Sequence, residues 1–259
     1  MKHVSSPANP HYKSLRKLVQ SSQERTRTGL SVLDGVHLAG AYRASGGTPR
    51  SIAVSRSGLE NPEVRGLLET MAGVEVIVLG DSLFGSLSSV ATPTGILAVI
   101  ETPRPRALPR HMETCAMLED LQDPGNLGSV LRSCAASGVG HVLLSKGSVH
   151  AWSPRVLRAG MGAHFALSIH EEADLVAAAR RFQGTRLATR ARAARTVFDV
   201  DLKGRIAFLF GNEGSGLSAR LLEAADAVVS IPMPGGAESL NVAAAAAVCL
   251  FERVRQLRQ

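Results

Sequence analysis

Two segments near the carboxyl end of the chain, FLFGNEGSGLS (208–218) and IPMPGGAESLNVAAAAA (231–247), indicate the fold most directly. Each segment begins as an apolar strand and ends in a polar loop, and the second loop leads into a helix. In open sheets, ligands bind where loops leave the carboxyl ends of the strands. We therefore expect one small-molecule pocket, shared by Asn212, Glu213, Ser239 and Asn241.

Strand-like and helical segments alternate from residue 115 to the end of the chain. The predicted strands are residues 115–118, 141–144, 166–169, 186–189, 206–210 and 228–231. Predicted helices begin near residues 127 and 240 or span 154–158 and 173–182. Because such alternation requires crossover connections, it predicts a mostly parallel sheet with helices on both faces.

The amino-terminal part is predicted to be a smaller unit of mixed helices and strands. A basic helix is expected near residues 13–20 and a second helix over 35–43, with strands at 52–54, 74–79 and 95–99. The stretch TPRPRALPRH (102–111) contains three prolines and four basic residues, so neither a regular helix nor a central strand fits it. We predict an α/β domain over residues 1–101, a linker over 102–111 and a second α/β domain over 112–259.

The composition suits a two-domain protein with a basic surface. The chain has 259 residues, 45% of them hydrophobic, and a formal net charge of +7. One basic cluster lies within the first thirty residues and another spans residues 180–195. Each cluster alone fits a solvated face as well as a phosphate-binding face, but two in one chain favour RNA or DNA as a partner. The candidates for RNA contacts are Lys13, Arg16, Lys17, Arg25 and Arg27.

Cysteine content and hydropathy exclude several other classes of protein. The cysteines Cys115, Cys134 and Cys249 lie far apart in apolar stretches, so we expect core residues and neither a metal site nor a disulfide framework. The amino terminus lacks the apolar core of a secretory signal, and the longest apolar run, residues 242–251, is too short to span a bilayer. We therefore expect no membrane partner and a reducing, cytoplasmic location.

An earlier loop, LEDLQDPGNLGSVLRSCAASGV (118–139), leaves a strand and enters a helix. Asn126 is predicted to cap the start of this helix, and Gly138 suits its end. Arg132 lies about two turns up the helix among apolar neighbours. A buried arginine needs either an anionic ligand or an internal ion pair, and the sequence favours neither over the other.

The two later loops also leave structural interpretations open. The glycine-rich loop at 211–218 lacks the Gly-Lys-Ser/Thr ending of a P-loop and follows a late strand, which weakens both common nucleotide-binding interpretations. On local grounds Glu213 fits an exposed turn residue. Ser239 is a plausible cap of the final helix, whereas Asn241 at the helix start suggests that its amide is used elsewhere. The alanine run at 243–247 predicts close packing against another helix or a second subunit.

Taken in order, NLGSVLRSCAASG, LFGNEGSGLS and IPMPGGAESLNVA resemble the three signature motifs of the SpoU (TrmH-like) family of RNA ribose 2′-O-methyltransferases, in the SPOUT superfamily. The resemblance covers residues 112–259, and NPHYKSLRKL, VLDGVHLAGAY and TPTGILAVI are similar to the RNA-binding extension of the family. It implies an α/β fold in which a trefoil-knotted SPOUT methyltransferase domain with a parallel sheet follows a smaller α/β RNA-binding (L30e-like) domain.

The resemblance implies S-adenosyl-L-methionine as the methyl donor and no metal. By motif matching, backbone groups of Gly211, Ile231 and Leu240 hold the donor, and Thr189 and Met233 complete the predicted donor-binding set. The positions matching the polar family residues are Arg132, Asn126, Glu213, Ser239 and Asn241. The resemblance implies that Arg132 acts on the attacking 2′-hydroxyl, as a general base or by orienting the ribose. Because the pKa of arginine lies above about 12, orientation is the milder role.

The resemblance also implies the partners of the chain. The family works as a homodimer with the final helix in the interface, and the extra amino-terminal module favours ribosomal RNA over transfer RNA. Asn126 and Asn241 are expected to position Arg132, and Glu213 to hold its guanidinium. Two alternatives remain: a catalytically inactive RNA-binding factor of the same fold, and a base-methylating relative, against which the SLN triplet argues.

Overall fold

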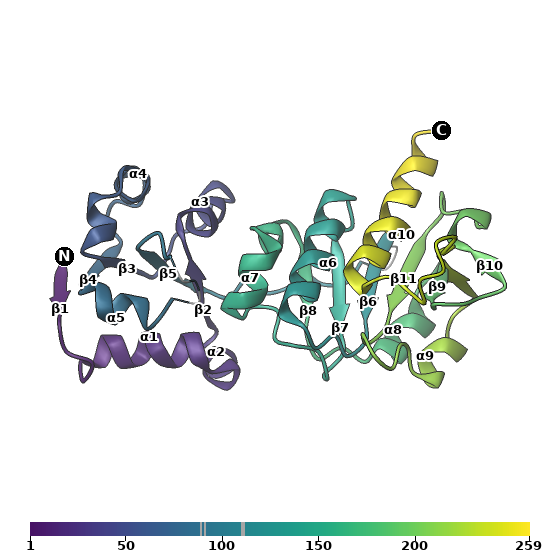
Figure 1. Ribbon diagram of the computed structural model, residues 1–259, viewed down its shortest axis with the longest axis horizontal. Coiled ribbons are helices and arrows are strands. Elements are labelled where there is room, and N and C mark those ends of the chain that lie inside the picture. Colours follow the sequence, from purple (N-terminus) through teal and green to yellow (C-terminus); the bar gives the residue numbers. More distant parts are fainter. Residues whose placement is uncertain (89, 91, 110–111) are drawn as a thin grey trace. The chain divides into compact units, whose positions relative to one another are not determined.

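The computed structural model describes residues 1–88, 90, 92–109 and 112–259, and its contacts divide the chain into two compact units (Figure 1). Unit 1 contains Met1–Pro103 together with Trp152–Phe165, and unit 2 contains Arg104–Ala151 and Ala166–Gln259. The segment Trp152–Phe165 is an addition to unit 1 that the pattern of strands and helices did not predict. The boundaries at residues 101 and 112 stay a prediction, and residues 110 and 111 of the predicted linker lie outside the described residues.

Unit 1 is built on a mixed five-stranded sheet with the order β1-β4-β3-β5-β2. Its strands are β1 (Lys2–Val4), β2 (Leu30–Asp34), β3 (Ser51–Ser55), β4 (Glu75–Leu79) and β5 (Ile96–Glu101). Strands β1, β4 and β3 are parallel, whereas β5 is antiparallel to both β3 and β2. Its helices are α1 (Pro10–Gln20), α2 (Ser22–Thr28), α3 (Val36–Ala44), α4 (Pro62–Glu69), α5 (Asp81–Gly85) and α7 (Pro154–Gly160), with the 3-10 helix η1 (Ser57–Glu60).

Helix α1 shows how this unit buries its core and where its basic side chains lie. The side chain of Asn9 accepts a hydrogen bond from the backbone of His11, and Pro10 occupies the first helical position, so the helix start is well defined. The residues of α1 that are buried against the sheet are Tyr12, Leu15 and Leu18. The basic helix predicted here is confirmed, and its exposed basic residues are Lys13, Arg16 and Lys17.

Arg25 corrects one of the predicted RNA contacts. Only 5% of this residue is exposed, and its Nη1 donates hydrogen bonds to the carbonyl oxygens of Leu18 at 2.7 Å and Val19 at 3.2 Å. These carbonyls belong to the last turn of α1, where carbonyl groups lack partners within the helix. Arg25 therefore joins α2 to α1 and is not available to RNA, whereas Arg27 is exposed and paired with Glu24 at 2.6 Å.

Unit 2 is a parallel seven-stranded sheet with the order β10-β12-β9-β11-β6-β7-β8. Its strands are β6 (Thr114–Leu118), β7 (His141–Leu144), β8 (Ser168–His170), β9 (Thr185–Thr189), β10 (Arg195–Thr196), β11 (Ile206–Phe210) and β12 (Ala227–Ser230). Its helices are α6 (Pro124–Ala136), α8 (Leu175–Arg181), α9 (Ala219–Glu223) and α10 (Val242–Leu257), with η3 (Val197–Asp199), while η2 (Ala163–Ala166) spans the division between the units. Strands β6 and β11 are buried along their whole length, as in sheets covered on both faces. The predicted α/β fold with a parallel sheet is confirmed, and the trefoil knot stays a prediction.

The cap of helix α6 lies three residues before the predicted one. The side chain of Asp123 accepts a hydrogen bond from the backbone of Asn126 at 2.8 Å, and Pro124 opens the helix. Proline is favoured at the first helical position because its missing N–H is not needed there. Asp123 is therefore the cap, and Asn126 lies in the first turn with its side chain free for another role. Gly138 has a φ of 82° just past the helix end, as predicted.

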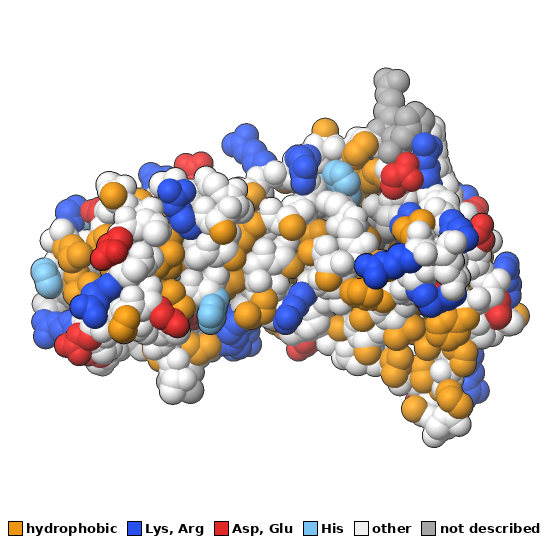
Figure 2. Space-filling view, turned by 90° about the horizontal axis from the view of Figure 1, so that it is seen from above, with side chains coloured by type: hydrophobic (Ala, Val, Ile, Leu, Met, Phe, Trp, Pro, Cys, Tyr) orange, Lys and Arg blue, Asp and Glu red, His pale blue; other side chains and the backbone are white. Residues whose placement is uncertain are grey.

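The surface and the cysteines agree with a two-domain α/β protein. In the described ranges, every helix is too short or too polar to cross a lipid bilayer. The free cysteines Cys115, Cys134 and Cys249 are buried core residues, as predicted, and burial raises the pKa of each thiol to about 12. On the face seen in Figure 2, Lys and Arg side chains are spread over many positions rather than gathered in one patch.

Candidate active site

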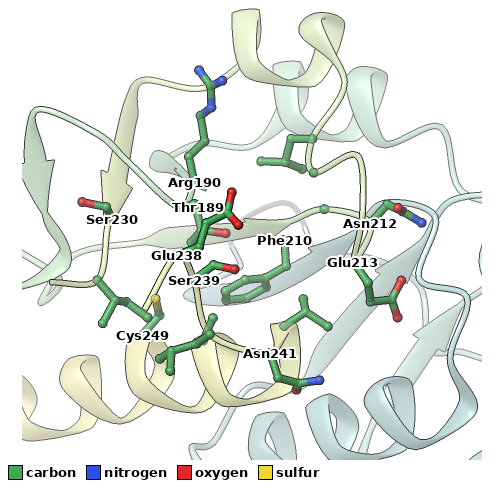
Figure 3. Close-up of a pocket in the computed structure, with 18 of the residues that line it drawn as sticks. Thr189, Arg190, Phe210, Asn212, Glu213, Ser230, Glu238, Ser239, Asn241 and Cys249 are labelled. Atoms are coloured by element: carbon green, nitrogen blue, oxygen red, sulfur yellow. The ribbon is translucent and has the colours of Figure 1, made fainter. Parts of the chain in front are cut away.

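A cavity of about 550 Å³ lies at the carboxyl ends of strands β9, β11 and β12 in unit 2 (Figure 3). It is enclosed by the loops that follow these strands and by the first turns of α10. The predicted donor-binding residues all line it: Gly211, Ile231, Leu240, Thr189 and Met233. Four of the five predicted catalytic residues line it as well: Asn126, Glu213, Ser239 and Asn241. The three sequence motifs therefore meet at one pocket.

Three side chains, one in the first turn of α6, one in the loop after β11 and one at the cap of α10, form a hydrogen-bonded chain beside this cavity. Asn241 Nδ2 donates to Asn126 Oδ1 at 2.8 Å, and Asn126 Nδ2 donates to Glu213 Oε1 at 3.0 Å. The Oδ1 atom of Asn241 accepts hydrogen bonds from the backbone of Ala243 at 2.9 Å and Ala244 at 3.4 Å. Figure 3 shows Glu213 and Asn241 on the same side of the pocket. The chain fixes both amides in one orientation.

The start of α10 differs from the one predicted. Helix α10 begins at Val242 with Asn241 as its cap, so Ser239 and Leu240 lie in the preceding loop. The expectation of a serine cap rested on residue type, since serine and asparagine are equally good caps. The structure uses Asn241 because its amide oxygen reaches the helix N–H groups while its amide nitrogen reaches Asn126.

The carboxylate of Glu213 is the acceptor at the end of the chain. Besides Asn126, it accepts hydrogen bonds from the backbone N–H groups of Gln122 and Asp123, each at 3.2 Å. Burial raises the pKa of Glu213, but the hydrogen bonds from Asn126 and from backbone N–H groups, its own included, together outweigh burial and hold that pKa below its ordinary value. Glu213 is therefore an ionised acceptor at neutral pH and more than an exposed turn residue.

Two further contacts, which the sequence reasoning missed, fasten the loop after β11 to the loop after β6. The carboxylate of Glu119 accepts hydrogen bonds from the backbone N–H of Ser218 at 2.6 Å and from its hydroxyl at 2.7 Å. Asn212 Nδ2 donates to the carbonyl of Asp120 at 2.7 Å. The available signal was the polar residues that directly follow two neighbouring strands, because β6 and β11 pair in register to their ends.

Gly211 keeps the loop after β11 compact. A Cβ atom at this position would collide with the backbone of Gly216 and Leu217. Two backbone hydrogen bonds of 3.0 Å join Asn212 and Gly216, so the loop turns back on itself. The loop thereby presents backbone groups to the cavity, which is the kind of wall that a ligand held through the backbone requires.

Arg132 is exposed, contrary to the sequence-based expectation of a buried arginine. Its buried neighbours on α6 are Val130, Leu131 and Cys134. Because successive helical residues are about 100° apart around the axis, Arg132 can face solvent beside them. Among the described residues its guanidinium has no hydrogen-bond or ion-pair partner, and it does not line the cavity. The expected contact with Glu213 is not formed, because Asn126 occupies that carboxylate.

The charged side chains that line the cavity are Arg190, Glu213 and Glu238. Two carboxylates against one guanidinium give the lining a net negative charge, which suits a ligand with a cationic centre. Over the described part of the chain, no group of three or more His, Cys, Asp or Glu residues is placed to hold a metal ion.

Comparisons with known proteins point to one family. Residues 113–251 match the SpoU rRNA Methylase family, and residues 9–98 match the MRM3-like substrate binding domain. The chain is 35% identical to an uncharacterized tRNA/rRNA methyltransferase of Synechocystis, covering 98% of this chain and 93% of that protein. It is 31% identical to a 23S rRNA (guanosine(2553)-2′-O)-methyltransferase of Bacillus subtilis, covering 97% and 98%. The crystal structure of an AdoMet-bound rRNA methyltransferase from Sinorhizobium meliloti superposes with a TM-score of 0.85 at 27% identity, covering 99% and 98%.

Proposed function

The chain belongs to the SpoU rRNA methylase family, and we propose that it methylates a ribose 2′-hydroxyl of ribosomal RNA. It is an RNA 2′-O-ribose methyltransferase, and its methyl donor is S-adenosylmethionine. Ribosomal RNA is favoured over transfer RNA by two observations. The family that matches residues 113–251 is described as SpoU rRNA Methylase, and the Bacillus relative that aligns over nearly the whole chain is named for 23S rRNA.

The chain of Asn241, Asn126 and Glu213 beside the cavity carries this proposal. It joins the first turn of α6 to the two loops that enclose the cavity, so the donor pocket and the start of α6 have one fixed geometry. Transfer of a methyl group to a hydroxyl requires the oxygen, carbon and sulfur atoms to be aligned. An RNA-binding factor without catalysis has no need for such alignment.

The donor fits the cavity on the grounds of its backbone-lined wall and its negative charge. We propose that backbone groups of Gly211, Ile231 and Leu240 hold its adenosine part, with Thr189 and Met233 completing the pocket. S-adenosylmethionine supplies a methyl group on a positively charged sulfur.

Arg132 is proposed to orient the acceptor ribose. Its guanidinium is exposed and without a partner among the described residues, so it is available to a phosphate or a hydroxyl of the RNA. A permanent cation beside the 2′-hydroxyl stabilises the developing negative charge on that oxygen. This role needs no proton transfer to or from the guanidinium, which stays protonated in proteins. Glu213 is a poor base because its hydrogen bonds lower its pKa.

We further propose a homodimer in which α10 contributes to the interface. The amino-terminal half of this helix is rich in alanine, which lets another helix approach closely, and Phe251 and Leu257 are 46% and 50% exposed in the single chain. Light scattering after size-exclusion chromatography is expected to give twice the chain mass. Replacing the exposed Ala244 with arginine is expected to give a monomer. The cytoplasmic location also stays a prediction.

The reaction is tested by incubating the protein with labelled S-adenosylmethionine and either large-subunit rRNA transcript or tRNA, followed by digestion to nucleosides. We expect a 2′-O-methylated nucleoside from rRNA. Arg132→Ala is expected to abolish transfer while donor binding stays measurable by calorimetry. A base-methylated product, or RNA binding without any product, would contradict the proposal, and undiminished turnover of the variant would remove Arg132 from the site.

A further inference from the structure

In the second basic cluster, at residues 180–195, some arginines bind partners within the chain and others do not. Arg186 forms an ion pair with Asp226, and Arg195 Nη2 donates to the carbonyl of Asp199 at 3.0 Å. Between them, in the loop from β9 to β10, Arg190 and Arg192 are exposed. Neither guanidinium has a hydrogen-bond or ion-pair partner within the described ranges. These two cations are therefore free to bind an external anion.

Arg190 lies at the lip of the donor cavity. It follows the last residue of β9 and lines the cavity together with Thr189 and Ala191. Its backbone N–H donates to the carbonyl of Val229 on β12 at 2.9 Å, so the base of the side chain is fixed. Figure 3 shows its guanidinium directed away from the other lining side chains, on the side of the pocket opposite Glu213.

The position of Glu238 limits where an anion can bind on this side. Its carboxylate lines the same cavity as Thr189 and Arg190. No ion pair joins Glu238 to Arg190 in the part of the chain that the structure describes. A negative group inside the pocket would meet the charge of Glu238, whereas one at the lip would meet the outward guanidinium first.

We propose that Arg190 and Arg192 bind phosphate groups of the substrate RNA at the lip of the donor cavity. The inference rests on the proposed function. A ribose that enters the pocket mouth carries its own phosphates with it, so these must lie around the mouth. Guanidinium groups bind phosphate through two parallel hydrogen bonds. Phosphate contacts set the register and orientation of a nucleic acid on a protein. The neighbours of these two exposed arginines in the loop are the small residues Ala191, Ala193 and Ala194.

The test measures RNA binding as a function of salt. The probe is an unmodified transcript of large-subunit rRNA, and the variants are Arg190→Gln, Arg192→Gln and the double variant. Each lost phosphate contact is expected to reduce the slope of log K against log salt by about one and the affinity by roughly fivefold to tenfold. The KM for RNA should rise, because the phosphate contacts are already made when the RNA binds.

The matched control is Lys203→Gln. Lys203 is exposed and precedes β11, so it lies at the amino-terminal end of that strand, whereas the cavity lies at the carboxyl end. The substitution removes one positive charge, as each arginine variant does. Its salt slope should equal that of the wild type. Arg190→Lys should keep the salt slope while losing part of the affinity, since lysine retains the charge without the paired donors.

Several outcomes would overturn the inference. Calorimetry with S-adenosylmethionine alone should show no loss of donor affinity in either glutamine variant, because removing a positive charge does not disfavour a cationic donor. A loss of donor affinity with an unchanged RNA slope would assign Arg190 to the donor carboxylate. If the salt slopes of Arg190→Gln and Arg192→Gln equal that of Lys203→Gln while the wild-type protein methylates RNA, the phosphate contacts are refuted and the proposed function is not. A wild type that neither binds nor methylates RNA would refute the proposed function as well.

Discussion

Replacing Asn126 with aspartate would turn the centre of the hydrogen-bonded chain into a second carboxylate. Asn126 Nδ2 now donates to Glu213 Oε1 at 3.0 Å. In the variant Asn126→Asp, an oxygen with negative charge takes the place of that donor. The shape of the side chain is nearly unchanged, so charge is the main perturbation.

The expected repulsion follows from the distance. At 3.0 Å, two unit charges repel by about 1.4 kcal/mol in water and by about 5.5 kcal/mol at an effective dielectric constant of 20. These energies correspond to a rise of about one to four pKa units for the carboxyl pair. Because Glu213 is largely exposed, solvent screening places the effect near the lower limit, at about one to two units.

The sign of the pH dependence differs between the two proteins. In the wild type, the lowered pKa of Glu213 contributes stability above its ordinary value of 4.5, and this stability is lost only as the pH falls through the lower folded value. In Asn126→Asp, the raised pKa of the pair favours the protonated form. Stability is then greatest at low pH and is lost as the pH rises through the raised value. A protonated Asp at this position also restores a donor to Glu213.

Thermal unfolding between pH 5 and 8 measures this difference. The melting temperature of Asn126→Asp should rise as the pH is lowered from 8 to 5, and single-turnover methyl transfer should recover in parallel, whereas the wild-type melting temperature should change little. Asn126→Ala removes the hydrogen bonds without adding charge and should show a deficit that does not depend on pH. If Asn126→Asp and Asn126→Ala have the same pH profile, the two carboxylates do not interact and the chain is not formed in solution.

Two other substitutions test separate parts of the structure. Gly211→Ala should abolish measurable donor binding in calorimetry, because its Cβ would collide with backbone of the same loop, while Gly214→Ala, whose nearest contact is an ordinary 3.6 Å, should bind normally. Equal affinities would show that the loop after β11 can open without cost. Arg25→Ala should destabilise unit 1 by about 2–3 kcal/mol, because it removes a buried donor to helix carbonyls. Replacing the exposed Arg16 with alanine should change the melting temperature little. If both variants shift the melting temperature equally, Arg25 is not buried in solution.

The strands of unit 2 could be predicted because their sequence signal is local. A continuous apolar run, such as the one that forms β11, predicts a strand buried on both faces, and the polar residues after it indicate the carboxyl end of the strand. Strand β10 has only two residues and is defined by its pairing with β12, so the sequence has no local pattern that predicts it. The same holds for Trp152–Phe165, whose packing in unit 1 depends on long-range contacts.

Side-chain roles were harder to predict than helices and strands because they depend on which partners the fold places within hydrogen-bonding distance. Arg25 and Arg27 are two residues apart in the same basic cluster, yet one is buried on helix carbonyls and the other is paired in solvent. Arg132 was expected to meet Glu213, but that carboxylate is saturated by an amide and by backbone donors. Composition gives the number of charges, and only the fold decides which of them remain available.

The residue types along the hydrogen-bonded chain follow from its direction. The chain starts at backbone N–H groups of α10, so the first side chain must accept there and then donate onward, which among the short capping residues only asparagine does with two separate atoms. Serine offers a single hydroxyl, and aspartate only accepts. Asn126 repeats the same polarity, accepting from Asn241 and donating to the next residue. The chain must end on a group that accepts from several donors at once, and the carboxylate of Glu213 does so. The orientation of α10 therefore sets the order of two amides and one carboxylate, which come from segments far apart in the sequence. It also ties the geometry of the donor pocket to the helix proposed to join the two subunits.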